Sequence, residues 1–356
     1  MTTTLRHENR APVTTTGAVS GPTALLRLFV EQGQSPWLDR LSRHHAEDGS
    51  LRRMVSAGIR GVIADLSAPA TAIDVSDVQE ACDILRPVYD SSDAIDGFVS
   101  VEVPPAPSDR SRSPASALWL RRRIDRPNLL VAIPATSQGI LAIRSMVSAG
   151  ANINATSIFS IDGYSAVIDA YLSGLEVLVA EGGDPGTVHG VATFAVARVD
   201  EAVNRQIDEA DDRGASRLHS LAGVAQAKLA YRIFQERFST ERWERLAGHG
   251  AHPQRLLWSS EADIAPGLEI AYVEDLIGPN TVRALSESAV TAFEDHGVVD
   301  RTLDTRLRDA AWALSELGAL GVDLDEVGAV LQAQRAERAR VPDRAMDRFH
   351  TDGPGR

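Results

Sequence analysis

Asn128-Leu129-Leu130-Val131-Ala132-Ile133-Pro134-Ala135-Thr136 is the stretch that decides the fold. Its short, nearly continuous apolar run predicts a strand that is buried on both faces, as in a parallel sheet. Strand alternation places Ala132 on the opposite face from Val131 and Ile133. We therefore expect the chain to fold around this strand, which delivers its last residues into a pocket.

Strand-like segments recur on both sides of this run, and the segments between them carry apolar residues at helical spacing. Alternation of strands and helices is typical of a parallel sheet covered by helices, which can close into a barrel. The predicted strands are residues 35–39, 61–65, 98–103, 128–136, 151–156, 191–199, 255–260 and 271–274. We predict the α/β class and a single (β/α)8 TIM barrel, which helices at 282–296 and 303–317 complete.

The chain of 356 residues suits one such barrel with extensions at both ends. Residues 1–22 are rich in threonine, and we expect a disordered, flexible arm there. Residues 23–330 form the predicted barrel. The arginine-rich residues 331–356 are the predicted C-terminal helical tail.

The charge balance limits the classes of partner. The chain has 36 basic and 49 acidic residues, a net charge of −13, which disfavours nucleic acid and anionic membranes. The start lacks the apolar core of a secretory signal, and we find no run of about 18 apolar residues that would span a membrane. We expect a cytoplasmic protein, a monomer or a homodimer, whose partner is a small molecule.

The sequence predicts neither a metal nor a cofactor. Cys82 is the single cysteine and falls on the apolar stripe of a helical segment, so we expect a core residue without a disulfide. The 9 histidines lack the spacing of metal ligands, and we expect a structural role for His189, which precedes a strand. A glycine-rich phosphate motif, HExxH and GxSxG are absent from the sequence.

Polar side chains gather where the predicted strands end. The active site of a TIM barrel lies at the carboxyl ends of its strands, so these residues are the candidates for a site. They are Asp39, Asp65, Glu102, Asn154, Thr156, Arg198 and Ser260, and the apolar Ala132 is a further candidate near these ends. Asn154 and Thr156 share one strand face with Asn152, and buried amides and hydroxyls need partners, which indicates a polar, ligand-sized interior.

From about residue 34 to 327 the chain resembles transaldolases of the longer bacterial type. In that family a lysine precedes the Ile-Pro-Ala-Thr that stands here as Ile133-Pro134-Ala135-Thr136. The resemblance is carried in order by residues 34–43, 81–89, 97–103, 125–136, 152–160, 195–200, 255–260 and 275–279.

The resemblance implies a site for carbohydrate metabolism, of the pentose phosphate type. Transaldolases transfer a three-carbon ketol unit between sugar phosphates, through a Schiff base on the lysine. By position, Asp39 and Glu102 match the acid/base carboxylates of the family. Asn154 and Thr156 match its polar pocket, where Thr156 would hold the catalytic water, and Arg198 matches a phosphate-binding arginine.

The departures from the family pattern concentrate at the chemistry. Ala132 stands where the family has its lysine, and an alanine cannot be a nucleophile. Asp65-Leu66 replaces Asn-Pro, and the insertion that usually follows is largely missing before Asp74. After Ser260 the family has Thr-Gly-Thr-Lys, whereas this chain has Glu261-Ala262-Asp263-Ile264. We therefore expect weak phosphate binding and no Schiff-base ketol transfer.

Structural interpretations stay open for several of these residues. Glu102 and Asp39 could be satisfied polar residues of the core, and Asp65 could be a loop cap instead of a new catalytic acid. Asn154 could simply hydrogen-bond to Thr156. Arg198 could form an ion pair with Asp200 or a neighbouring acid. Ser260 and Ala132 are predicted only to line the ligand site.

Three functions follow. The first is a divergent enzyme that uses general acid/base chemistry on a carbonyl or polyol substrate, in a specialised pathway. The second is a non-catalytic pseudoenzyme that binds a sugar or a partner protein. The third is Schiff-base chemistry through another amine, for which the only lysine is Lys228. Its predicted place in the middle of a helix, snorkelling at the helix edge, argues against this third function.

Overall fold

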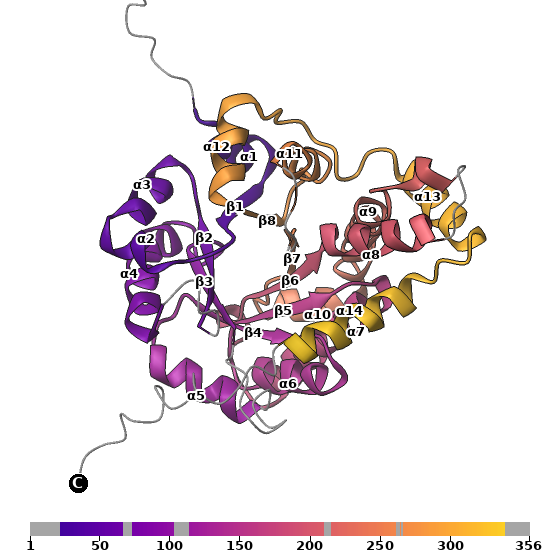
Figure 1. The fold of residues 1–356 in the computed structure, drawn as a ribbon. Coiled ribbons are helices and arrows are strands. Elements are labelled where there is room, and N and C mark those ends of the chain that lie inside the picture. The colour runs from indigo at the N-terminus through magenta and orange to yellow at the C-terminus, as the bar shows by residue number, and fades with distance from the viewer. Residues whose placement is uncertain are drawn as a thin grey trace, which may run out of the picture.

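Eight parallel strands close into a barrel, as predicted. The computed structural model describes residues 22–66, 73–102, 114–209, 215–260, 264 and 266–338. Each strand pairs with the next in the chain, and β8 pairs with β1 to complete the ring (Figure 1). The strands are β1 (Gln34–Leu38), β2 (Gly61–Asp65), β3 (Phe98–Glu102), β4 (Leu129–Pro134), β5 (Ile153–Ile158), β6 (Gly190–Ala195), β7 (Arg255–Ser259) and β8 (Thr281–Leu285).

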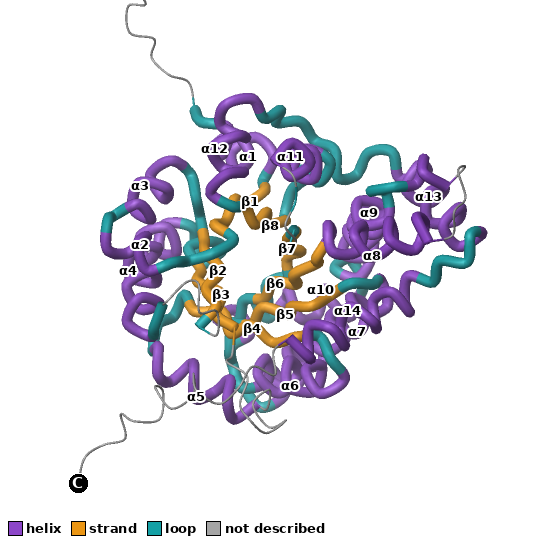
Figure 2. Tube along the Cα trace, viewed as in Figure 1, coloured by secondary structure: helices purple, strands orange, loops and turns teal. Residues whose placement is uncertain are grey.

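Helices surround the barrel, and Figure 2 shows the strands as an inner ring with helices outside it. Helix α1 (Ala24–Gln32) precedes β1. The helices between strands are α2 (Arg43–Glu47), α3 (Ser50–Ala57), α4 (Val75–Ser91), α5 (Pro114–Ile124), α6 (Ser137–Ser148), α7 (Ile161–Ala180), α8 (Val196–Glu209), α9 (Ala222–Arg237), α10 (Glu241–Gly248) and α11 (Pro266–Glu274). After β8 come α12 (Glu287–His296), α13 (Leu307–Ala319) and α14 (Leu324–Arg338).

Two apolar layers hold the barrel. The main core lies between strands and helices and contains Val131 and Ile133 of β4, whereas a smaller cluster fills the interior and contains Leu130 and Trp37. This division confirms the predicted alternation along β4. The interior is tight at its amino end, because a Cβ atom on Gly61 would lie only 2.5 Å from the Trp37 ring.

Hydroxyl caps set the turns after three strands. The side chains of Thr136, Ser160 and Ser286 accept hydrogen bonds from backbone N–H groups in the first turns of α6, α7 and α12. Such caps satisfy N–H groups that have no partner within a helix, so the chain can turn from strand to helix within one or two residues. The carboxyl ends of β4, β5 and β8 are therefore held in fixed positions.

The structure corrects three predicted elements. The predicted strand at 271–274 belongs to helix α11, and the last strand is β8, whose residues were predicted to begin a helix. The predicted strand 191–199 ends at Ala195, where α8 begins. Short apolar runs fit a buried strand and a buried helix equally well, which explains these errors. Gly278-Pro279-Asn280 is the turn signal that marks the start of β8.

The chain ends lie partly beyond the described residues. Of the predicted arm, 1–21 lie outside them, as do 339–356 of the predicted tail and all of the 104–114 loop except Pro114. Helix α14 begins at Leu324 and crosses the predicted boundary at residue 330. It contacts α8, α7 and β5, and in Figure 1 its yellow ribbon ends near β4.

Helix α7 is the one described helix that is long and apolar enough to cross a membrane by length and composition. It packs on α6, β5 and β6. Its residues Tyr164, Val167, Ile168 and Tyr171 are buried. These contacts are those of a barrel helix.

Candidate functional site

A lateral row of four residues crosses the carboxyl-end half of the barrel. Asp65 of β2 pairs in register with Glu102 of β3, and Glu102 pairs with Ala132 of β4. Ala132 in turn pairs with Asn154 of β5. Neighbouring strands lie about 4.8 Å apart, so two carboxyl groups stand side by side next to the small alanine side chain.

Asn154 is the centre of a polar layer inside the barrel. Its Nδ2 donates to Ser100 Oγ over 2.9 Å, and its Oδ1 accepts from Thr193 Oγ1 over 2.7 Å. All three side chains are buried. The alternative in which Asn154 bonds to Thr156 is not the arrangement found. Thr193 was not among the predicted site residues, although its position two residues after Val191 puts it on the interior face of β6.

Thr156 pairs with Pro134 at the end of β4, the strand that also contains Ala132. It is 6% exposed, and its Oγ1 has no hydrogen-bond partner within the described residues. The register of β5 shifts between Ala155 and Ile158, and Ser157 adopts a positive φ of 59°. Such irregular backbone at a strand end redirects side chains near a ligand site. A buried hydroxyl without a partner is a position for a bound water or a ligand oxygen.

Helix α14 brings two side chains to the same strand ends. Arg335 Nη2 donates to Glu102 Oε2 over 2.8 Å. Gln332 Nε2 donates to the carbonyl oxygens of Ala135 and Ser157, at 3.0 and 3.3 Å. The site therefore contains a guanidinium from the segment that was predicted to be a C-terminal helical tail. The three- and four-residue spacing of Leu331, Gln332 and Arg335 is the signal that these residues share a helix face.

Asp39 and Ser260 lie elsewhere on the rim. Asp39 follows β1, and Ser260 follows β7, so the two residues lie on either side of β8. Between them stands Arg283 of β8, whose Nη2 donates to Ser260 Oγ over 3.3 Å. Asp39 acts on Arg283 electrostatically. Asp39 is separated from Glu102 by one strand, since β2 lies between β1 and β3.

Arg198 was predicted to lie near the end of a strand, but it lies in the first turn of α8. It forms an ion pair with Glu201 at 3.1 Å, which is the open alternative of a pair with a neighbouring acid. The adjacent Asp200 instead accepts hydrogen bonds from Tyr272 Oη and the Gly223 N–H, at 2.7 and 2.8 Å. Burial raises the pKa of Asp200 to about 6.

Lys228 lies away from the row of carboxyl groups. Its Nζ donates to the carbonyl oxygens of Thr302 and Thr305, at 2.6 and 3.2 Å. Thr302 in turn bonds to the Ile277 backbone, which precedes β8 at the amino end of the barrel. Lys228 is 7% exposed, so it is a buried structural residue and does not snorkel at the helix edge as predicted. Burial lowers the pKa of this lysine.

His44, His45 and Glu287 are close enough to suggest a metal site. The Ser42 backbone N–H donates to His45 Nδ1 over 3.0 Å, which leaves the ring proton on Nε2 to bond Glu287 Oε1 at 2.9 Å. A metal on Nε2 would displace that proton while Nδ1 still serves as an acceptor, which a neutral imidazole cannot do. The donor set fits a helix cap and does not fit a metal.

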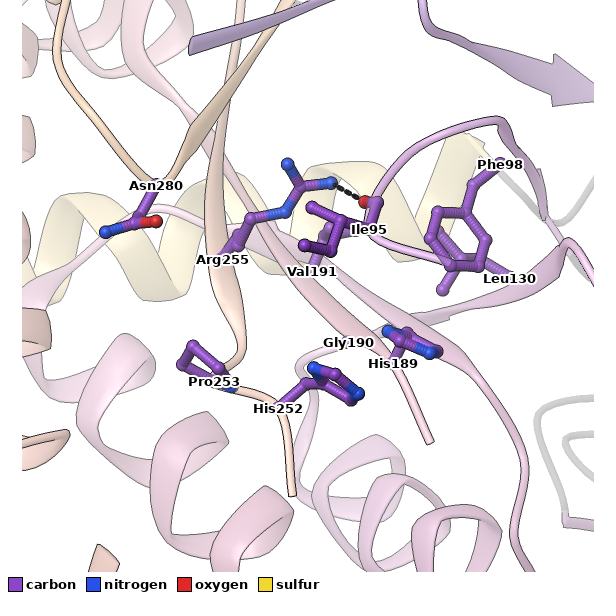
Figure 3. Close-up of a pocket in the computed structure, with 10 residues that line it drawn as sticks. All are labelled: Ile95, Phe98, Leu130, His189, Gly190, Val191, His252, Pro253, Arg255 and Asn280. Carbon is purple, nitrogen blue, oxygen red and sulfur yellow. Dashed lines mark hydrogen bonds between the residues drawn. The ribbon is translucent and has the colours of Figure 1, made fainter. Parts of the chain in front are cut away.

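A cavity of about 120 Å³ opens at the amino end of the barrel, remote from these residues. Figure 3 shows Phe98, Leu130 and Val191 on its wall, with His189 beside His252. The two imidazoles stack with ring centroids 4.4 Å apart. Burial lowers the pKa of His189 to about 3, so it is neutral at physiological pH. We assign this end a structural role, since barrel chemistry lies at the carboxyl ends.

Comparison with known proteins identifies the family. A model of the transaldolase/fructose-6-phosphate aldolase family matches residues 37–339. The chain belongs to this family.

The curated relatives of this transaldolase-family chain cover almost its whole length. It is 40% identical over 337 residues to a transaldolase of Parafrankia sp. (strain EAN1pec), which covers 85% of this chain and 90% of the relative. A transaldolase of Frankia alni (strain DSM 45986 / CECT 9034 / ACN14a) is 37% identical over 341 residues, which cover 86% of this chain and 91% of the relative. A Mycolicibacterium paratuberculosis transaldolase is 36% identical over 338 residues, with coverage of 86% and 91%. The predicted family and barrel are therefore confirmed, together with the general class of carbohydrate metabolism.

Proposed function

We propose that this transaldolase-family protein performs general acid/base chemistry on a carbonyl or polyol ligand, without a Schiff base. The single observation that carries the proposal is the row of Asp65, Glu102 and Ala132 across three neighbouring strands. Two carboxyl groups can remove and return a proton, whereas the methyl group between Glu102 and Asn154 cannot bond covalently to a ketone.

Surrounding groups support proton transfer in this row. The buried Thr156 hydroxyl has no protein partner in the described part of the chain and is suited to hold a water. A guanidinium near a carboxyl group favours its ionised form, so Arg335 favours Glu102 as a base. Asp65, its register neighbour, is the carboxyl group that we assign to return the proton. Enolisation, isomerisation, dehydration and hydrolysis all need only these two roles.

The environment proposed for this chemistry follows from the sequence. The ligand is a small sugar or sugar-derived molecule, in a specialised carbohydrate pathway of the cytoplasm. Neither nucleic acid nor a membrane is a partner, and neither a cofactor nor a metal takes part. The protein works as a monomer or a homodimer.

Proton exchange tests the proposal directly. The protein is incubated in D₂O with a panel of ketoses, aldoses and their phosphates, and the deuterium content is followed by mass spectrometry. We expect exchange with at least one compound, and its loss in Glu102→Gln and Asp65→Asn. Arg255→Met, at the amino end of the barrel, is the matched control and should retain exchange. Unchanged isotope content across the panel contradicts the proposal.

A non-catalytic binding role is the second candidate. It is favoured by the contacts of α14, since Arg335 and Gln332 occupy polar groups at the ends of β3, β4 and β5. In this case a ligand or partner protein would bind without turnover. Thermal stabilisation by a sugar that shows neither exchange nor conversion would favour this candidate.

A further inference from the structure

Helix α14 is anchored against the carboxyl ends of the strands by apolar residues. Val327 and Leu331 belong to one buried cluster with Phe159, the residue that directly follows β5. Gly328 permits a close approach to the start of α7, because a Cβ atom there would lie 3.2 Å from the Cβ of Ser160. The helix is therefore held next to the proposed site, and its yellow ribbon in Figure 1 runs toward β4.

Gln332 joins the ends of β4 and β5. Its Nε2 donates to the carbonyl oxygens of Ala135 and Ser157, at 3.0 and 3.3 Å. The Ala135 N–H donates to the Thr156 carbonyl oxygen over 2.7 Å, so the two strand ends are linked in two ways. Ser157 has a φ of 59°, which is unfavourable for a residue with a Cβ atom and persists only where the surroundings hold it. The Gln332 contact supports this backbone, which carries the Thr156 hydroxyl.

Arg335 follows Gln332 by three residues and reaches β3. Its Nη2 donates to Glu102 Oε2 over 2.8 Å. A guanidinium on a carboxylate oxygen fixes the direction of the carboxyl group and favours its charged form. Asp65 on β2 is a charged register neighbour of Glu102, whereas Ala132 on β4 brings no charge. Arg335 is thus a cation that α14 adds to the row of carboxyl groups.

We propose that α14 assembles the acid/base site. Arg335 is the positioning residue for Glu102, and Gln332 is the positioning residue for Thr156. The inference rests on the proposed function, in which Glu102 is the base and Thr156 holds a water. It deepens that function by adding a condition, because both groups take their working positions only while the C-terminal helix is docked. Neither residue replaces the missing amine, since each acts through another group.

Titration of Glu102 tests the Arg335 contact without any turnover. The full chain is labelled with carbon-13 at its glutamate carboxyl groups, and the Glu102 signal, assigned with Glu102→Gln, is followed against pH by NMR. The pH midpoint of this signal should rise by about 1 in Arg335→Gln, because the carboxylate loses a cation. Arg335→Lys keeps the charge and should show a smaller rise. Asp65 is present in all these proteins, so the difference between them reports the residue at position 335.

Proton-exchange kinetics test what the two residues do for the reaction. The kcat for exchange, with the ketose, aldose or phosphate that exchanges in D₂O, should fall about 10- to 100-fold in Arg335→Gln and in Gln332→Leu. The KM should change little, because a displaced base or water slows the chemical step and not binding. Arg335→Lys should recover part of the loss, since lysine supplies the charge without the planar donors.

A second glutamine on α14 provides the matched control. Gln334 is exposed, so Gln334→Leu should retain the full kcat. Gln332→Asn, which is too short to reach both carbonyl oxygens, covers the case in which Gln332→Leu fails to fold.

Three outcomes overturn the inference. They are a Glu102 midpoint that stays unchanged in Arg335→Gln, a kcat that is retained or raised in the Arg335 and Gln332 variants, and a raised KM at constant kcat, which would indicate a helix that only covers the site. Absence of exchange from the unsubstituted protein contradicts the proposed function instead. In that case, a Glu102 midpoint that depends on Arg335 would still support the assembly of these groups by α14.

Discussion

Arg335 and Glu102 join the last described helix to the third strand of the barrel, through a hydrogen bond of 2.8 Å between Nη2 and Oε2. Glu102 is also the register neighbour of Ala132. A cation therefore stands beside this carboxylate, although position 132 does not supply one. In the sequence these residues are separated by more than half of the chain, so their contact follows only from the closed fold.

This ion pair should couple α14 to the barrel energetically. The side chains are 29% and 24% exposed, so we expect a coupling energy of about 1 kcal/mol, discounted for solvent screening. A double-mutant cycle with Arg335→Gln and Glu102→Gln, followed by urea unfolding, measures it. The exposed pair Arg232–Glu236 on α9 is the control and should give about 0.3 kcal/mol. A coupling energy near zero for Arg335 and Glu102 would contradict the α14 contact.

Thr156 and Thr193 should respond oppositely to the same substitution. Thr156→Val removes a buried hydroxyl that has no described partner, so the unfolding free energy should rise by about 1 kcal/mol while proton exchange is lost. Thr193→Val deprives Asn154 Oδ1 of its donor and should cost about 1–3 kcal/mol. Chemical denaturation of both variants checks this. A destabilised Thr156→Val would contradict an unpaired hydroxyl.

Asp200 should make stability fall as pH rises. Burial raises its folded-state pKa from 3.8 to about 6, so the folded state binds the proton more tightly than the unfolded state. The resulting stabilisation is complete below about pH 4 and is lost as pH rises through about 6. Asp200→Asn should lack this pH-dependent stabilisation. The difference in unfolding free energy between the unsubstituted protein and the variant should therefore change by about 2–3 kcal/mol between pH 4 and 7. A pH-independent difference between pH 4 and 7 would contradict this assignment.

The sequence predicted the features that depend on local pattern. Alternation in residues 128–136 identified the faces of β4, and the ends of β2 and β3 gave Asp65 and Glu102 as candidates. The register that pairs Asp65, Glu102 and Ala132 could not be predicted from the sequence, because it depends on strand pairing between distant segments. Arg335 was missed for the same reason, since its spacing fits an exposed tail equally well. Arg283 was missed because a buried arginine in a strand resembles the charged face of a helix.

The failures around Arg198 and β8 have a common physical cause. Apolar runs in these segments are short, so strand and helix periods cannot be separated over their length. The tertiary fold decides between them by pairing β8 with β7 and β1 on both sides. The segments that resemble the family follow the family's order along the chain, but the resemblance did not predict where each strand ends.

Borohydride trapping of Ala132→Lys beside the unsubstituted protein tests the central claim most directly. Each protein is incubated with fructose 6-phosphate, reduced, and examined by intact-mass and peptide mass spectrometry, with Ala132→Met as the control for side-chain size. We expect a reduced ketose adduct on residue 132 of Ala132→Lys alone. An adduct on the unsubstituted protein, or the absence of one from a folded Ala132→Lys, would contradict a pocket that lacks only the amine.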